Sequence, residues 1–291
     1  MRRAVLCVAM ALIASLVALG PSAAAAPPRV EPLMIAGCGP TLPKPGGGTW
    51  ECTFADEFNG SSLDRSKWLP QTNFATGTSS AASRSCHVDH PDNVAVRQGF
   101  LQLTVRKVST PVVCMGGPAN YTSGQVSTYH RFSQQYGRFE ARMKVHFTWG
   151  SIPGLQEAFW MWPDDRVPSD VQWPAAGEID VAELYSQFNT YVVPFLHYTA
   201  NDNGGPKPGV NTAYCAAARG RFNTYTLTWT PSTLTILVNG KTCLVNTSGD
   251  PAFQKPYILA FSQALGVGSN ALRSNTPMPA TMHVDYMRVW R

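Results

Sequence analysis

Short runs in which apolar and polar residues alternate dominate the chain from Trp50 onward. Examples of such runs are Leu101–Val105, Arg138–Val145, Tyr225–Trp229, Leu234–Val238 and His283–Trp290. A period of two places successive side chains on opposite faces, so each run is typical of a strand with one buried face. Asn239 and Gly240, directly after the fourth run, indicate a tight hairpin turn.

The sequence contains no convincing amphipathic helix longer than three turns and no internal repeat. The 24 glycines and 23 prolines punctuate the runs at short intervals, and an aromatic content of 11% supplies material for a packed core. Many short strands separated by turns favour an all-β sandwich of two antiparallel sheets.

The first residues are typical of a targeting segment. Arg2 and Arg3 precede the apolar stretch Ala4–Leu19, and the small residues Ala23–Ala26 follow it. We therefore predict that 1–26 is a secretory signal peptide and that the mature protein is secreted to the extracellular space. An uncleaved anchor is the alternative. No later stretch reaches the roughly 20 apolar residues of a membrane span, so we expect no stable membrane insertion.

Cysteine usage agrees with export. Cys7 lies in the predicted signal peptide, and an even number of cysteines remains, which predicts disulfides in an exported chain. The remaining cysteines are Cys38, Cys52, Cys86, Cys114, Cys215 and Cys243. Sequential pairing (38–52, 86–114, 215–243) closes short local loops and is the pairing that we expect. Zinc binding is the alternative, but no C-x-x-C or H-x-x-x-H spacing supports it.

The charge pattern bears on the partner. The formal net charge is only +5, and no run of Lys or Arg forms a stripe that could follow a phosphate backbone. We therefore do not expect nucleic acid as a partner.

Three acids lie close together in the segment Glu178–Glu183. In a strand, Glu178 and Asp180 share one face, whereas a regular continuation would place Glu183 on the opposite, apolar face. Burying an unpaired carboxylate there is costly. A β-bulge near Val181-Ala182 would return Glu183 to the face of the other two acids, so the sequence predicts a bulge.

Carboxyls that crowd together repel, so at least one pKa should rise. Hydrolysis of a glycosidic bond needs such a pair, with one carboxyl protonated and the other ionised. A solvated acidic edge or a calcium site is the alternative. Tryptophans favour the glycan interpretation, because their rings can stack on the C–H faces of sugars, although each ring could also be a core filler. These tryptophans are Trp149, Trp160, Trp162 and Trp173.

The segment Trp173–Glu183 (Trp-Pro-Ala-Ala-Gly-Glu-Ile-Asp-Val-Ala-Glu) resembles the active-site signature of glycoside hydrolase family 16, in its bulged laminarinase-like form. Further blocks resemble the family's strands in the same order. These blocks are Phe54–Gly60, Asn93–Val94, Ser123–Val126, Tyr136–Arg142 and Val284–Val289. The resemblance covers about residues 50–291.

The resemblance implies a concanavalin-like β-jelly-roll sandwich with a substrate cleft across its concave sheet. A Pro/Gly-rich N-terminal arm, 27–48, would precede a single catalytic domain, 49–291. The implied mechanism is retaining, with Glu178 as the nucleophile and Glu183 as the general acid/base. Asp180 would orient the nucleophile. The carboxyls of Glu178 and Glu183 should lie about 5–5.5 Å apart.

The resemblance also suggests residues that contact the sugar. They are Trp173, Trp160, Trp162, Asn93, His197 and Gln263. A purely structural role is the alternative for His197.

No cofactor is expected for catalysis. Relatives often hold a structural calcium, and Glu57, the Gly99 carbonyl and Asp285 stand at matching positions with suitable oxygen ligands. Local pairing of Asp285 is the alternative.

Two segments depart from the family pattern, namely Ile152–Ala158 and Phe261–Gly268. Both should edge the cleft, so they affect the choice of substrate rather than the reaction. We predict a monomeric, retaining endo-glycosidase that hydrolyses β-1,3- or mixed β-1,3/1,4-glucan. The alternatives are the same chemistry on a galactan or another cell-wall polysaccharide, transglycosylation, and a non-catalytic glycan-binding module.

Overall fold

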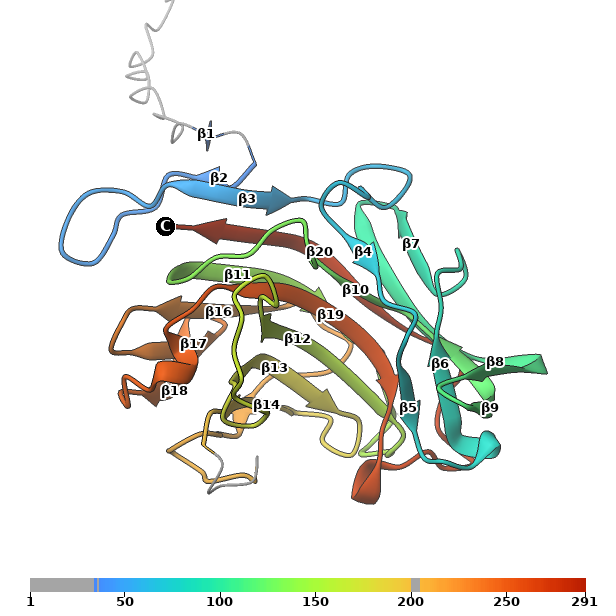
Figure 1. Cartoon of the computed structure of the whole chain (residues 1–291). Helices are drawn as coiled ribbons and strands as arrows, with labels where there is room; N and C mark the ends of the chain where they lie inside the picture. The colour runs from blue at the N-terminus through green and yellow to red at the C-terminus, as the bar shows by residue number, and fades with distance from the viewer. Residues whose placement is uncertain (1–33, 36, 200–204) are drawn as a thin grey trace, which may run out of the picture. The chain divides into compact units, whose positions relative to one another are not determined.

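The computed structural model describes residues 34, 35, 37–199 and 205–291 (Figure 1). The predicted signal peptide, 1–26, lies outside the described residues, as does the first part of the predicted arm. Within the described part, strands make up nearly all the regular structure. Three short 3-10 turns accompany them: η1 (Ala81–Ser83), η3 (Pro251–Phe253) and η4 (Gly268–Asn270). Among these residues, no helix is long and apolar enough to cross a membrane.

Two large sheets form the body of the fold. In spatial order, the seven-stranded sheet contains β15 (Cys215–Ala216), β14 (Tyr191–His197), β13 (Glu178–Tyr185), β12 (Leu155–Pro163), β19 (Tyr257–Leu265), β10 (Gln125–Ser127) and β4 (Leu69–Pro70). Figure 1 shows β12 and β13 following the curve of β19.

The other large sheet has 11 strands. Its main order is β18 (Lys241–Asn246), β17 (Leu234–Val238), β16 (Asn223–Trp229), β11 (Gly137–Lys144), β20 (Ala280–Trp290), β8 (Phe100–Cys114), β9 (Gly117–Ser123), β6 (Arg84–His87) and β5 (Ala75–Gly77). Beside this path, β3 (Cys52–Asp56) pairs with β20, and β7 (Val94–Arg97) pairs with β8. A small separate pair is formed by β1 (Met34–Ile35) and β2 (Gly39–Pro40).

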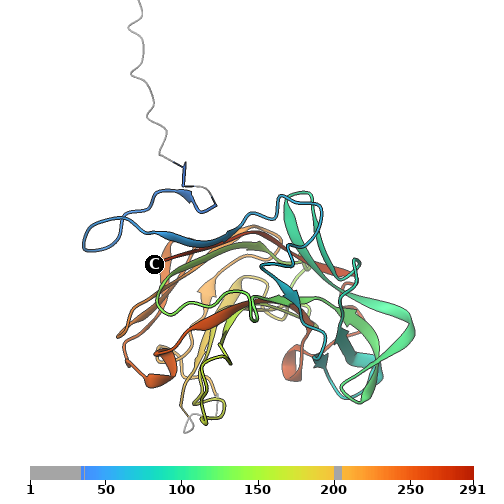
Figure 2. The same cartoon turned by 45° about the horizontal axis from the view of Figure 1, so that its top comes forward.

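Alternating apolar residues build the core between the two large sheets. The ring of Trp229 on β16 meets that of Tyr257 on β19 edge to face, with centroids 5.4 Å apart. Phe139 on β11 and Phe159 on β12 are both fully buried in the same cluster. Figure 2 shows the two layers from a second side. The all-β jelly-roll prediction is therefore confirmed, and its physical basis is the burial of one face of each sheet.

The local sequence signals match the structure closely. Leu234–Val238 is a strand as predicted, and Asn239 and Gly240 take positive φ angles of 51° and 76° in the turn that follows. Such angles suit a two-residue hairpin that joins β17 to β18.

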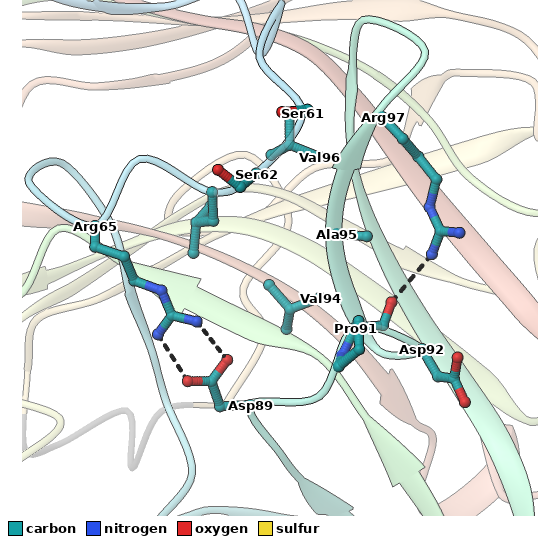
Figure 3. Close-up of a pocket in the computed structure, with 11 residues that line it drawn as sticks. Ser61, Ser62, Arg65, Asp89, Pro91, Asp92, Val94, Ala95, Val96 and Arg97 are labelled. Carbon is teal, nitrogen blue, oxygen red and sulfur yellow. Dashed lines mark hydrogen bonds and ion pairs between the residues drawn. The ribbon is translucent and has the colours of Figure 1, made fainter.

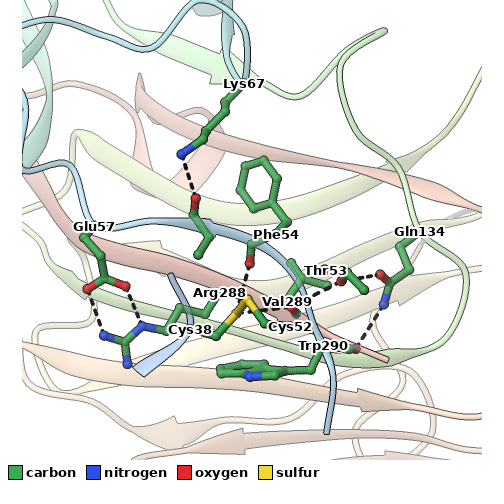
Figure 4. Close-up of a disulfide and its surroundings, with 11 residues drawn as sticks. Cys38, Cys52, Thr53, Phe54, Glu57, Lys67, Gln134, Arg288, Val289 and Trp290 are labelled. Carbon is green, nitrogen blue, oxygen red and sulfur yellow. Dashed lines mark hydrogen bonds and ion pairs between the residues drawn. A yellow bond between two sulfur atoms is a disulfide. The ribbon is translucent and has the colours of Figure 1, made fainter. Parts of the chain in front are cut away.

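The three disulfides join the cysteines sequentially, as expected: Cys38–Cys52, Cys86–Cys114 and Cys215–Cys243. Figure 4 shows the first of them beside β3 and β20. This bond fixes the segment before β3 against the large sheet, because Cys52 pairs in register with Trp290 of β20.

Candidate active site

The predicted bulge exists, and it places three acids on one face of β13. Against β12, Ala158 pairs with Glu183 and Trp160 pairs with Asp180. Against β14, Asp180 pairs with Phe195 and Glu183 pairs with Val193, so two residues of β13 oppose one of β14. The two residues between Asp180 and Glu183 are Val181 and Ala182, and both are fully buried. The extra residue thus keeps the apolar side chains inside and the acids in the cleft.

A cleft of about 170 Å³ lies above these acids. It is bounded by residues from β5, β6, β10, β12, β13 and β19: Thr76, His87, Gln125, Gln156, Ala158, Trp160, Glu178, Asp180, Glu183, Ser262 and Ala264. Small residues on β12 and β19 leave room above the acids, and Trp160 supplies an aromatic wall. The ring of Trp162 meets that of Trp160 edge to face, with centroids 6.2 Å apart.

Glu178 is held from the side by Trp173. The indole Nε1–H of Trp173 donates to Oε2 of Glu178 over 2.8 Å. Gly177 comes immediately before Glu178 and has a φ of +95°. A Cβ on Gly177 would lie 2.0 Å from the Tyr257 hydroxyl, so the chain can enter β13 here only through a glycine.

Asp180 faces His197 on the neighbouring strand. Nε2 of His197 lies 3.3 Å from Oδ2 of Asp180 and 4.0 Å from Oε2 of Glu178. The imidazole stacks on Phe195 at 4.1 Å between ring centroids and lies 5.2 Å from the Trp173 ring. His197 is therefore held where a positive charge on its ring favours the ionised forms of the neighbouring carboxyls.

Glu183 has different partners. Nε2 of Gln156 donates to Oε1 of Glu183 over 2.8 Å. The hydroxyl of Tyr185, two residues further along the same face, also favours the ionised form of Glu183 through a hydrogen bond. The two outer acids therefore sit in distinct polar settings although they share one strand.

Burial dominates the proton affinities of the three acids. It raises the pKa of Glu178 to about 8, and the charge of Asp180 adds to this effect, whereas His197 and Trp173 oppose it. Burial, and then the charge of Glu183, hold the pKa of Asp180 well above its usual range. Burial likewise raises the pKa of Glu183. The cluster thus retains protons at neutral pH, and a proton on Asp180 removes the charge that opposes ionisation of Glu178.

The family model for glycosyl hydrolases family 16 matches residues 82–287, which include this whole cluster. The chain belongs to that family.

Two curated relatives extend the family match. Over 265 residues the chain is 29% identical to the glucan endo-1,3-beta-glucosidase A1 of Niallia circulans. This match covers 81% of this chain and 37% of the relative. It is 28% identical to the keratan-sulfate endo-1,4-beta-galactosidase of Sphingobacterium multivorum, over 83% of this chain and 55% of the relative. The chain therefore spans between about a third and just over half the length of these relatives.

A solved structure shows the same architecture. A non-specific endo-beta-1,3(4)-glucanase from family 16 superposes with a TM-score of 0.72 at 27% identity, over 88% of this chain and 96% of that one.

The structure brings most of the predicted site residues of this family 16 protein together. Trp173 and His197 contact the acids directly, and Trp160 lines the cleft. Trp162 lies beside Trp160 on the same face of β12. Trp149 is 86% exposed and does not line the cleft.

Two residues that were predicted to contact the sugar do not line the cleft. Gln263 lies on the core face of β19, opposite to the cleft residues Ser262 and Ala264, and its Nε2 donates to Glu157 over 3.2 Å. Asn93 is buried outside the cleft, and its Nδ2 donates to the carbonyl of Thr104 over 2.8 Å. In both cases the side-chain amide donates its hydrogen bond to a group inside the protein.

No individual site role was predicted for Gln156, Tyr185 or His87, although Gln156 lies in the segment Ile152–Ala158 that was expected to edge the cleft. Gln156 and Tyr185 each lie two residues from a recognised cleft position, Ala158 and Glu183, so the period of two could have found them. His87 lines the cleft from β6, and burial lowers its pKa to about 4, so it is neutral near pH 7. It has no comparable signal in the sequence.

The expected calcium ligands do not fit a calcium site. Arg288 donates two hydrogen bonds to the Glu57 carboxylate, over 2.7 and 2.8 Å, as Figure 4 shows. Arg142 pairs with Asp285. Each carboxylate is thus already neutralised by a guanidinium, and no interaction among the described residues joins them to Gly99. We assign no ion there.

A larger cavity of about 640 Å³ lies elsewhere, between residues 61–65 and β7 (Figure 3). Its charged groups are paired within the protein. Arg65 donates to Asp89 over 2.7 and 2.8 Å, and Arg97 donates to the carbonyl of Pro91 over 3.0 Å. This cavity lacks a crowded pair of buried acids, so we place the chemistry in the smaller cleft.

Proposed function

We propose that this family 16 protein is an endo-glycosidase that hydrolyses β-1,3- or mixed β-1,3/1,4-glucan with retention of anomeric configuration. One observation carries the proposal: Glu178 and Glu183 share one face of β13 in a single cleft, yet each has its own hydrogen-bond donor. Two carboxyls in unlike settings suit an acid and a nucleophile.

In the proposed first step, the Glu178 carboxylate attacks the anomeric carbon while Glu183 gives its proton to the departing glycosidic oxygen. The bond to the leaving sugar breaks as the glycosyl-enzyme bond forms. Trp173 and His197 favour the ionised form of Glu178. The mechanism requires about 5–5.5 Å between the two carboxyls.

In the second step, Glu183 takes a proton from water, and the resulting hydroxide displaces Glu178 from the anomeric carbon. Asp180 retains its proton through the cycle, because burial and the neighbouring charge both oppose its ionisation. A neutral Asp180 can donate a hydrogen bond, and it spares Glu178 a second negative charge.

The reaction is tested with laminarin and lichenan. The wild-type protein should release reducing ends from at least one of them, and Glu178→Gln and Glu183→Gln should each lower the rate by several orders of magnitude. NMR of the first product should show the anomeric configuration of the substrate. Inverted product, or full activity in Glu178→Gln, would contradict the assigned roles.

A galactan or another cell-wall polysaccharide is the second candidate substrate. It is favoured by Gln156, which lies in the segment Ile152–Ala158 that departs from the family pattern and which lines the cleft. The galactosidase relative is also consistent with it. Product mass analysis across a panel of polysaccharides separates the two candidates, and sugar–sugar products at high substrate concentration would indicate transglycosylation.

We also propose that the protein works outside the cell as a monomer. Support for export comes from the three disulfides and from the N-terminal sequence pattern. Mass spectrometry of the protein in culture medium tests export. Light scattering of the purified protein tests whether it is a monomer.

A further inference from the structure

Gln156 is the cleft residue whose contact bears most directly on the acid/base carboxyl. It lies on β12, where it pairs in register with Tyr185 of β13. Its side chain points to the cleft and donates to Oε1 of Glu183 over 2.8 Å. This hydrogen bond restrains the orientation of the Glu183 carboxyl within the cleft.

Buried polar contacts hold the residues on both sides of Gln156. The N–H of Leu155 donates to the Ser186 hydroxyl over 2.9 Å, and the carbonyl of Leu155 accepts from Nδ2 of Asn270 over 2.8 Å. On the other side, Glu157 is held by two hydrogen bonds from Arg219, over 2.7 and 2.9 Å, and neither side chain is exposed. The Gln156 amide is therefore placed by a rigid segment.

Several titratable groups surround Glu183, and their effects oppose one another. Burial favours the neutral acid, whereas Tyr185, Gln156 and the charge of His197 favour the ionised form. The titratable groups on the elements that face Glu183 are Glu178, Asp180 and Tyr185 on β13, His197 on β14 and His87 on β6, with Tyr214 close to Tyr185. Gln156 differs from all of them because its side-chain amide is neutral and does not titrate.

We propose that Gln156 is a positioning residue that orients the Glu183 carboxyl and limits how tightly Glu183 holds its proton. The inference rests on the proposed function, since it assigns Glu183 to acid/base catalysis.

The primary test does not depend on turnover. Carbon-13 NMR of side-chain carboxyls in the full chain follows the titration of Glu183 in wild type and in Gln156→Met. Loss of this hydrogen bond to the charged carboxylate should raise the Glu183 midpoint by about one to two pH units. A midpoint that is unchanged or lower would overturn the proposal, and a lower midpoint would mean that the amide oxygen accepts the acid proton.

Gln125→Met is the matched control. Gln125 lines the same cleft but donates no side-chain hydrogen bond to Glu183 among the described contacts. The same change there should leave the Glu183 midpoint in place. Gln156→Asn keeps the amide but shortens its reach, so it should shift the midpoint as Gln156→Met does, and it serves if the methionine variant does not fold.

Kinetics give an independent readout. The alkaline limb of kcat/KM on the best polysaccharide should move upward in Gln156→Met by the shift seen in the titration. Near neutral pH, the fall in kcat should be smaller for an aryl glycoside with a good leaving group, which needs little protonation. If the wild type cleaves no polysaccharide, the proposed function fails, whereas the titration still decides the role of Gln156.

Discussion

Arg219 and Glu157 form a bidentate ion pair in which neither side chain has any exposed surface. Arg219 also donates through Nε to the carbonyl of His146 over 3.0 Å, and Gln263 donates to Glu157. The pair thus joins β12, β19 and the segment before β16 directly behind the strand that carries Gln156.

Breaking this pair should cost much more stability than breaking a surface pair. Arg219→Met leaves the Glu157 carboxylate buried without its counter-charge, so we expect a loss of about 3–5 kcal/mol in the free energy of unfolding. Denaturant unfolding measures it. Replacing both residues with methionine should recover most of the loss, because no lone charge then remains buried.

The control for this prediction is Arg65→Met. Arg65 pairs with Asp89, but their side chains are 58% and 40% exposed. The loss there should stay below about 1 kcal/mol. Equal losses at the two sites would show that burial does not set the strength of these pairs.

Trp173→Phe should change the acidic limb of the activity profile. The substitution keeps an aromatic ring but removes the N–H that donates to Glu178. That donor lowers the pKa of Glu178, so its loss raises the pKa, and a nucleophile must be ionised to attack. The acidic limb of kcat/KM should therefore move up by up to about one pH unit. Trp149→Phe, at a ring outside the cleft, should leave the limb in place.

The stability of the protein should fall as pH rises from 6.5 to 8. Burial raises the pKa of Glu178 to about 8 in the folded state, so the folded state binds more protons than the unfolded state in this window. The slope of the unfolding free energy against pH is then negative, at up to about 1.4 kcal/mol per pH unit for each retained proton. His87, whose folded pKa is about 4, acts in the opposite direction but only below pH 6.5.

Thermal unfolding at constant ionic strength measures this slope. Glu178→Gln and Asp180→Asn each remove a group that must lose its proton on unfolding, so each should flatten the slope and stabilise the protein at pH 8. A slope that is positive in wild type, or unchanged in both variants, would contradict the raised pKa values.

Gly177→Ala should damage both stability and activity. The backbone of Gly177 has a φ of +95°, and the added Cβ would lie 2.0 Å from the Tyr257 hydroxyl. We expect a loss of at least about 1–2 kcal/mol from the backbone conformation alone. Adding Tyr257→Phe removes the close hydroxyl but not the backbone strain, so the double variant should recover only part of the loss in denaturant unfolding. Full recovery would mean that the backbone adapts freely.

The sequence determined the strands and the bulge. Alternation along Leu234–Val238 identified a strand to the residue, because one face of it is apolar and the other is not. The spacing of Glu178, Asp180 and Glu183 required an extra residue, since a carboxylate cannot point into an apolar core without a partner. Both signals are local, and local chemistry was sufficient.

The tertiary structure decided which groups meet across strands. Strand β19 is buried along nearly its whole length, so its sequence shows no polar face. The sequence therefore does not predict that Gln263 points inward to Glu157. Likewise, Glu57 and Asp285 have the composition of calcium ligands, but the packing of β3, β11 and β20 places an arginine on each of them.

The same limit applies to the acid that we assign to catalysis. The identity of Glu183 followed from its spacing along β13, but its donor comes from the neighbouring strand β12. The register between two strands depends on side-chain packing over the whole sheet and on the bulge itself. The sequence therefore determined which residues could do the chemistry, and only the folded sheet decided which neighbours control their protons.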